Sequence, residues 1–202
     1  MDIKIEIPLK KSVFCQDGKV GESIELVIDP DDRQVTHVVV KEDSGAREER
    51  LVPVELISGI YADKMILNCK TDELKKLNIF CERDVIMESV DSAISDHRSS
   101  MYNFPVTKRV VVENKSVPDG KLTFDGDTYI EATDGRVGRL VKFLVAAESK
   151  CITHMVMQST AFLGPRETFV PITSIERFKD QKIYLNLTKK QVKELQTAPE
   201  YA

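Results

Sequence analysis

The sequence predicts an all-β protein built from two copies of one small unit. Three observations support this prediction. Short motifs recur far apart in the chain: Asp17-Gly18-Lys19-Val20-Gly21 returns as Asp134-Gly135-Arg136-Val137-Gly138. Apolar residues within each copy alternate with a period of two, which is typical of strands. Turn-forming pairs such as Asp-Gly separate these short runs, as expected for hairpins.

The spacing of further motifs aligns the two copies. Val35-Thr36-His37-Val38-Val39 returns as Ile152-Thr153-His154-Met155-Val156, an offset of 117 (154 − 37) that the Asp-Gly motif shares (134 − 17). Val52-Pro53-Val54 matches Val170-Pro171-Ile172, where the offset is 118 (171 − 53). One residue has therefore entered the second copy, near 162–165, where a surface loop tolerates insertion.

Each copy begins with a hairpin. Its Asp-Gly pair supplies the positive φ of a tight turn. The strand that follows places alternate apolar residues on one face in both copies. These are Ile24, Leu26 and Ile28 in the first copy and Val141, Phe143 and Val145 in the second. Val27 and Leu144 break the alternation, which predicts that the second face is covered near the end of this strand. The next strand, 34–41 or 151–158, is rich in the β-branched residues that suit a pleated surface.

Each copy closes with a short strand, 64–68 or 182–187, followed by helical spacing. Thr188 and Gln191 form a capping box before the second of these helices. The unit thus contains about five or six strands and one or two helical turns, which favours a small, partly closed barrel.

The predicted domains are a first repeat at 1–80, a linker at 81–105 and a second repeat at 106–202. In the linker, Ile86 and Val90 have helical spacing, so a short amphipathic helix and a loose linker remain open alternatives. Residues 106–113 are predicted to form a strand leading into the second repeat.

Composition disfavours nucleic acid as a partner. The chain has 202 residues with 42% hydrophobic residues and 31% charged residues, and its formal net charge is −4. Affinity for nucleic acid depends largely on Lys and Arg. The basic pairs lack interleaved aromatic residues that could stack on bases; they are Lys10-Lys11, Lys108-Arg109 and Lys189-Lys190.

The cysteines and the N-terminus predict a cytoplasmic protein without membrane insertion. Cys15, Cys69, Cys81 and Cys151 are scattered with no C-x-x-C pair, and we interpret them as small buried hydrophobes in a reducing compartment. The first eleven residues alternate charged and apolar side chains, unlike a signal peptide. No later run approaches the ~20 apolar residues of a spanning helix.

Together, these motifs resemble the PRC-barrel family, known from the H subunit of photosynthetic reaction centres and from a ribosome-maturation factor. The resemblance lies in the D-G-x-V-G turn, the T-H strand, the V-P segment and the final strand ending in L-N. It implies two tandem small PRC-type β-barrels, each ending in a short helix. The motif residues that it marks as structural are Asp17, Gly18, Gly21, His37, Pro53, Asp134, Gly135, Gly138, His154 and Pro171.

Residues that could carry chemistry have simpler interpretations. His37 and His154 occupy equivalent positions, but their motifs contain no nearby Cys, Asp or Glu to orient or ligate them. Asp29 and its acidic neighbours lack the Gly and Glu positions of an EF-hand loop, so they predict a solvated turn. Asp96, His97 and Ser99 are neighbours in the linker, not a triad converging from a rigid scaffold. The prediction is no enzyme, no metal and no cofactor.

The expected function is a non-catalytic adaptor or scaffold of unknown pathway that binds protein partners through its β-barrels. Self-association as a homodimer is compatible with exposed strand edges. Two alternatives stay open. One is a ribosome- or RNA-associated maturation factor, which predicts a clustered basic face. The other is a small-molecule sensor with a pocket between the barrels.

Overall fold

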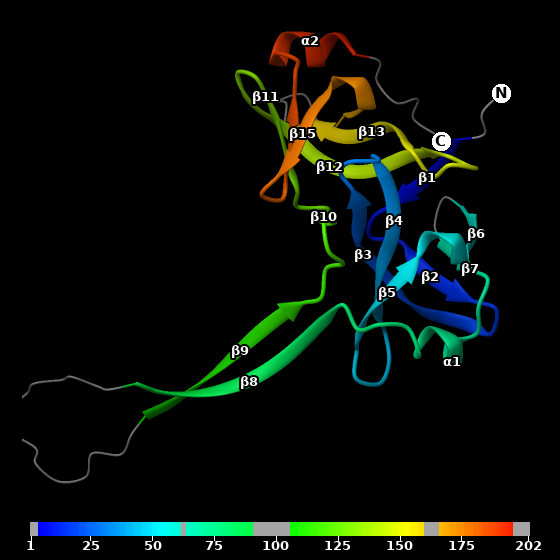
Figure 1. The fold of residues 1–202 in the computed structure, drawn as a ribbon, viewed down its shortest axis with the longest axis vertical. Helices are drawn as coiled ribbons and strands as arrows, with labels where there is room; N and C mark the ends of the chain where they lie inside the picture. The colour runs from blue at the N-terminus through cyan, green and yellow to red at the C-terminus, as the bar shows by residue number, and fades with distance from the viewer. Residues whose placement is uncertain (1–3, 62–63, 91–105, 160–165, 196–202) are drawn as a thin grey trace, which may run out of the picture. The chain divides into compact units, whose positions relative to one another are not determined.

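Strands make up most of the part that the computed structural model describes, residues 4–61, 64–90, 106–159 and 166–195 (Figure 1). The all-β prediction is confirmed. Of the helices in these ranges, none has the length and apolar character needed to cross a membrane. The chain divides into two compact units, Met1–Phe80 with Val117–Ala202, and Cys81–Ser116.

The first unit contains two seven-stranded mixed sheets with corresponding strand orders. The first sheet has the order β5-β4-β3-β2-β7-β6, with β10 also paired to β3. Its strands are β2 Ser12–Cys15, β3 Gly18–Asp29, β4 Gln34–Glu42, β5 Glu49–Pro53, β6 Ile57–Ile60, β7 Lys64–Leu67 and β10 Leu122–Asp125.

The second sheet has the order β14-β13-β12-β11-β16-β15, with β1 also paired to β12. Its strands are β1 Lys4–Pro8, β11 Tyr129–Ala132, β12 Gly135–Ala146, β13 Ile152–Ser159, β14 Glu167–Pro171, β15 Ile175–Lys179 and β16 Lys182–Leu185. No pairing among the described strands joins β14 to β15 or β5 to β6. Two open mixed sheets are therefore what the pairing shows, and closed barrels remain a prediction.

The two sheets exchange one strand each. The N-terminal strand β1 pairs with β12, and β10, which precedes β11 in the chain, pairs with β3 (Figure 1). The registers correspond: Ile7 lies opposite Phe143, and Phe124 lies opposite Leu26. Both pairs of positions are related by the offset of 117 (124 − 7 and 143 − 26). The exchange is therefore reciprocal, and neither sheet is complete within its own segment of the chain.

The sheets also meet at a pair of equivalent positions. Gln34 and Cys151, which the same offset relates (151 − 34 = 117), form an isolated antiparallel bridge. Beside it, the Val35 amide donates to the Lys150 carbonyl at 3.3 Å, and the Ile152 amide donates to the Arg33 carbonyl at 2.8 Å. These contacts are each other's counterparts, so an approximate internal two-fold axis passes between Gln34 and Cys151.

One hydrophobic core serves both sheets. Buried side chains of β2, β3, β4 and β7 belong to the same cluster as those of β11, β12, β13 and β16. Val27 is fully buried, as the break in its strand's alternation predicts. The ring of Phe124 on β10 lies 5.5 Å from that of Phe178 on β15, which joins an exchanged strand to the other sheet.

A short helix follows β7 in the first sheet and β16 in the second: α1 at Thr71–Leu74 and α2 at Lys189–Glu194. The predicted capping box is confirmed at α2, where Thr188 Oγ1 accepts the Gln191 amide and the Gln191 side chain accepts the Thr188 amide. At α1, the Glu73 carboxylate accepts the Lys70 amide at 2.8 Å. Both helices thus begin with satisfied N–H groups.

The second unit is a two-stranded antiparallel hairpin. Its strands β8 Cys81–Val90 and β9 Val106–Lys115 pair from Cys81 opposite Lys115 to Val90 opposite Val106. Residues 81–90 therefore form a strand, whereas a helix and a loose linker were the two predicted alternatives. Apolar residues four positions apart share a face in a strand as well as in a helix, so their spacing does not distinguish the two. Residues 106–113 form the predicted strand but pair with β8. Residues 91–105, with the discounted Asp96, His97 and Ser99, lie outside the described residues.

Candidate functional site

The repeated Asp of the turn motif holds the start of a helix in both halves. The Asp17 carboxylate accepts the Thr71 amide at 3.0 Å and the Thr71 hydroxyl at 2.8 Å. Asp134 accepts the Lys189 amide at 2.8 Å. The bonds from Thr71 hold the pKa of Asp17 below its ordinary value, because they favour the charged carboxylate. This motif is a structural link between turn and helix.

The repeated glycines are required for two different physical reasons. Gly18 and Gly135 have φ of +146° and +119°, a region that side chains rarely adopt. At Gly21 a Cβ atom would lie 1.9 Å from the Lys41 carbonyl oxygen, and at Gly138 it would lie 2.3 Å from that of Gln158. The first pair of glycines thus makes the turn, and the second allows close strand pairing.

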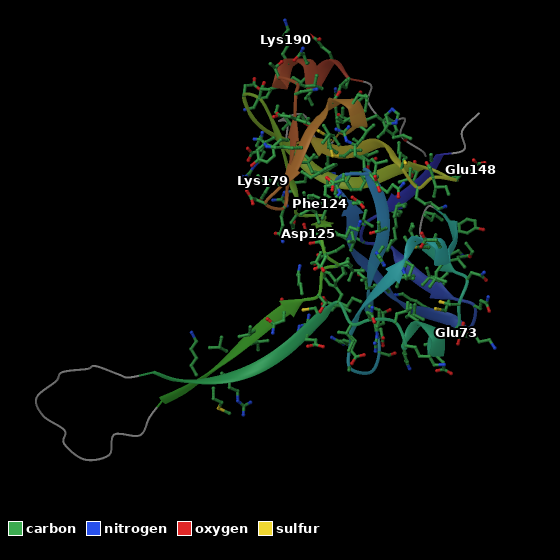
Figure 2. All side chains as sticks on the ribbon, in the orientation of Figure 1. Glu73, Phe124, Asp125, Glu148, Lys179 and Lys190 are labelled. Atoms are coloured by element: carbon green, nitrogen blue, oxygen red, sulfur yellow. The ribbon has the colours of Figure 1, made fainter. Side chains whose placement is uncertain are left out.

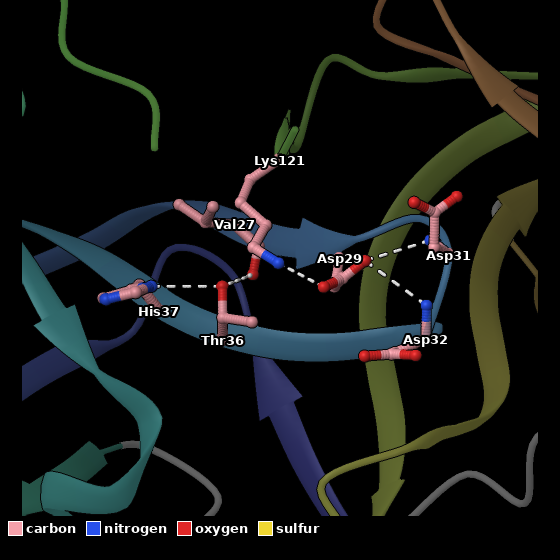
Figure 3. A network of polar contacts seen from close by, with 7 residues as sticks. All are labelled: Val27, Asp29, Asp31, Asp32, Thr36, His37 and Lys121. Atoms are coloured by element: carbon pink, nitrogen blue, oxygen red, sulfur yellow. Dashed lines mark hydrogen bonds and ion pairs between the residues drawn. The ribbon is translucent and has the colours of Figure 1, made fainter. Parts of the chain in front are cut away.

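The two histidines lie on β4 and β13, opposite the two motif prolines: His37 pairs with Pro53, and His154 pairs with Pro171. His37 Nδ1 lies 3.1 Å from Thr36 Oγ1, which donates to the Val27 carbonyl (Figure 3). Burial lowers the pKa of His37 and so favours its neutral form. The charge of Glu55 opposes this shift, and the charge of Lys121 adds to it.

The acidic turn at residues 29–32 is organised by the Asp29 carboxylate. Asp29 accepts the Asp31 amide at 3.0 Å and the Asp32 amide at 3.3 Å, and its other oxygen pairs with the Lys121 ammonium (Figure 3). The hydrogen bond from Lys121 lowers the pKa of Asp29. Lys121 directly precedes β10, so this pair helps to seat the exchanged strand. Within the described ranges, no three His, Cys, Asp or Glu side chains are grouped to hold a metal.

The outer face of the second sheet gathers aromatic and cationic side chains from four strands. Register places Tyr129 on β11 opposite Arg139 and Lys182, and Lys182 opposite Lys179. Lys179 lies at the end of β15 (Figure 2). These residues form the first row across the sheet, and their neighbours Ile130 and Ile183 are fully buried on the other face.

A second row lies two residues along β11, β15 and β16, and three residues along β12, where the register shifts. Register places Glu131 on β11 opposite Arg136 and Tyr184, and Tyr184 opposite Arg177. We call the two rows together the Arg/Tyr face. Its members are Tyr129, Glu131, Arg136, Arg139, Arg177, Lys179, Lys182 and Tyr184.

Cation–π contacts order this face. The guanidinium carbon of Arg136 lies 3.5 Å from the ring centroid of Tyr129, and that of Arg139 lies 5.1 Å from it. Arg177 lies 4.6 Å from the ring of Tyr184. Each such contact contributes ~0.5–1 kcal/mol at an exposed site. These contacts therefore restrict the positions of the arginine side chains.

Carboxylates moderate the positive charge. Arg139 pairs with Asp127 at 3.1 Å, Arg177 with Glu176 at 2.9 Å and Lys182 with Glu131 at 2.9 Å. Lys179 lies 4.0 Å from Asp180. Five cations and four carboxylates thus occupy the face and its border, a net charge of +1 (5 − 4). The hydrogen bond from Lys182 to Glu131 raises the pKa of Lys182.

The equivalent face of the first sheet has another character. Its positions hold Ser12, Phe14, Lys19, Glu22, Gly59, Tyr61, Lys64 and Ile66. The Lys64 ammonium lies 5.8 Å from the ring of Phe14 and 5.7 Å from that of Tyr61, which is 57% exposed. Arginine is absent from these positions, so the Arg/Tyr face belongs to the second sheet alone.

Sequence reasoning missed the Arg/Tyr face because its members come from 129–139 and 177–184. The two segments are far apart in the sequence, and neither alone contains the whole set of cations and rings. The parallel pairing of β11 with β16 brings the two segments together. An alternating pattern with Arg or Tyr at the outward positions of both segments is the signal that could have indicated it.

Neither a protein-family model nor a curated protein sequence matches this chain.

Proposed function

We propose that this protein is a non-catalytic adaptor that binds a protein partner through the Arg/Tyr face. The assignment of its two halves as tandem PRC-type barrels is part of the same proposal. It is supported by the repeated motifs and by the corresponding strand orders of the two sheets. The observation that carries the binding function is the pair of tyrosine rings contacted by Arg136, Arg139 and Arg177 across four strands.

Composition favours a protein partner. Tyr and Arg are enriched at the centres of protein interfaces, where a few such residues carry most of the binding energy. Here they project from a sheet whose other face is buried, so little conformational entropy is lost on binding. The mixed charges suit a partner surface that offers carboxylates to the arginines and apolar groups to the rings.

RNA is the second candidate, favoured by the presence of five cations and two aromatic rings on one sheet face. The ring of Tyr129 is already covered by Arg136 at 3.5 Å, and a base would have to displace it. Four carboxylates lie beside the cations and would repel phosphates. These contacts make protein the better match.

The test is affinity capture from the native cell lysate with the intact protein, at low and high salt and with nuclease. The variant Arg136→Ala/Arg177→Ala removes the two arginines stacked on the different rings. Its matched control is Lys75→Ala/Lys76→Ala, which removes two exposed lysines beyond α1 of the first sheet.

The adaptor proposal predicts that the wild type and the lysine control capture the same protein at high salt and after nuclease treatment. The arginine variant should fail to capture it. Direct titration of that partner should then show at least tenfold weaker binding, a factor that corresponds to ~1.4 kcal/mol. Material lost with nuclease or salt would support RNA instead. Equal capture by all three proteins would show that the Arg/Tyr face is not the binding surface.

A further inference from the structure

Two buried thiols lie in contact in the first sheet. Cys15 ends β2, and Cys69 lies between β7 and α1; their sulfur atoms are 3.6 Å apart and each residue is 5% exposed. Parallel pairing of β2 with β7 and a 3.0 Å hydrogen bond from the Gln16 amide to the Cys69 carbonyl hold these segments together. The two sulfurs are thus positioned by the sheet itself.

The fold does not need sulfur at these positions. The counterparts in the second sheet are Ala132 (15 + 117) and Leu187 (69 + 118). The backbone arrangement there is the same, because the Thr133 amide donates to the Leu187 carbonyl at 2.9 Å. Ala and Leu pack where the first sheet has two cysteines, so packing alone does not account for the pair.

We propose that Cys15 and Cys69 form a modification site, at which a low-molecular-weight disulfide such as oxidised glutathione converts the two thiols into an intramolecular disulfide. A disulfide needs sulfur atoms about 2.0 Å apart, and side-chain rotation can supply most of the approach from contact distance. The bond would join residues 54 positions apart (69 − 15) and so tie β2 to the segment that begins α1.

The environment of the thiols sets the order of the steps. Burial and the contact with Cys69 raise the pKa of Cys15 to about 12. Burial raises the pKa of Cys69 as well, but its hydrogen bond with Cys15 opposes the rise. The carboxylates of Asp17 and Glu73 raise both values. Cys69, whose hydrogen bond with Cys15 favours its thiolate, is therefore the attacking residue, and burial makes both thiols slow to react.

The exchange proceeds in two steps. Cys69 loses its proton to water, and its thiolate attacks one sulfur of the small disulfide, which releases one small thiolate and leaves a mixed disulfide. Cys15 then loses its proton and attacks the Cys69 sulfur, which forms the internal bond and releases the second small thiolate. Two protein thiols are oxidised, and the small disulfide is reduced to two thiols.

The experiment treats the full chain with increasing oxidised glutathione, blocks remaining thiols with iodoacetamide under denaturing conditions and maps the products by mass spectrometry. The expected product is a peptide pair joining Cys15 to Cys69, with the loss of two hydrogen atoms. Its formation should raise the thermal midpoint by roughly 5–10 °C, because a closed loop restricts the unfolded chain.

Two variants make the result decisive. Cys15→Ala/Cys69→Leu copies the pair of the second sheet, so it should fold, and it should show neither the linked peptides nor the thermal shift. Cys151→Ser removes a half-buried cysteine outside the pair and should leave both intact. The proposal is overturned if Cys15 and Cys69 stay fully alkylated in treated wild type, or if the linked peptides instead contain Cys151.

Discussion

The two sheets of this protein have corresponding strand orders but different outer faces. Inward positions remain apolar in both: Val13 corresponds to Ile130, and Met65 corresponds to Ile183, and all four are fully buried. One residue further along the same strands, Phe14 corresponds to Glu131 and Ile66 to Tyr184. At these inward positions one apolar residue replaces another, whereas the outward positions change in charge and size. In the second sheet the outward positions hold the Arg/Tyr face.

The largest effect is expected from separating the two halves. Fragment 1–80 would leave β3 without β10, and fragment 117–202 would leave β12 without β1. Each fragment would expose core side chains such as Ile7 or Phe143, so we expect no cooperative unfolding transition from either alone. Circular dichroism during heating measures this, and mixing the fragments should restore the transition. A fragment 1–80 that unfolds as steeply as the intact chain would contradict the exchange.

The next largest effect concerns a buried ion network found only in the first sheet. Arg50 donates to the Glu42 carboxylate and to the Leu77 carbonyl, each at 3.0 Å, and its counterpart in the second sheet is Thr168. Arg50→Thr should cost about 3 kcal/mol of unfolding free energy, because it leaves Glu42 buried without its partner.

The matched test of this network is the double variant Arg50→Thr/Glu42→Ser, which copies both residues of the second sheet, where Ser159 corresponds to Glu42. It should recover part of the lost stability in urea unfolding, since position 42 no longer holds a buried, unpaired carboxylate. The partly exposed Glu48, which also pairs with Arg50, loses that partner in both variants. If the double variant loses as much unfolding free energy as Arg50→Thr and Glu42→Ser do in sum, the two side chains are not coupled.

Glycine substitutions should rank the close approaches in the two sheets. Gly21→Ala should cost about 3 kcal/mol and Gly138→Ala about 2 kcal/mol, because the new methyl groups would meet backbone oxygens of the paired strand. Gly45→Ala is the control: its methyl group enters open space, and only its φ of +70° costs about 1 kcal/mol. Chemical denaturation gives the three values. Equal losses at all three positions would show that the strands move apart without penalty.

The smallest effect is a pH dependence that belongs to the first sheet. Asp29 has a folded-state pKa below its ordinary value of 3.8, so its contribution is present above that pH and is lost as pH falls through the folded pKa. The second sheet has Ala146 at this position. Asp29→Ala should therefore flatten the loss of stability in acid, measured as the urea midpoint against pH. An unchanged acid limb would exclude Asp29 as a contributor.

Local features of the fold could be predicted from the sequence. The helix cap at Thr188 and the burial of Val27 depend on residues a few positions apart, which periodicity and turn chemistry describe well. The strand exchange could not be predicted from the sequence. Alternation at Ile5 and Ile7 is typical of a strand, but it does not indicate which of two corresponding sheets the strand joins. The hairpin was missed because the spacing of Ile86 and Val90 suits a helix and a strand equally.

The candidate site could not be predicted from the sequence for a related reason. The Arg/Tyr face needs the parallel pairing of β11 with β16, whose residues are about fifty positions apart (182 − 129 = 53). Similarly, nothing in the spacing of Cys15 and Cys69 indicates that their sulfurs touch. Both features depend on contacts between distant segments, which a single sequence without relatives does not reveal.

The strand exchange also has a consequence for the order in which the molecule assembles during synthesis. Lys4 pairs with Ala146, so β1 has no partner on β12 until more than 140 further residues have been synthesised (146 − 4 = 142). The first sheet is likewise incomplete until β10, which begins at Leu122, has been synthesised. Contacts this distant along the chain slow folding and prolong the exposure of apolar strands. Strand β1 is thus synthesised long before the strand with which it pairs.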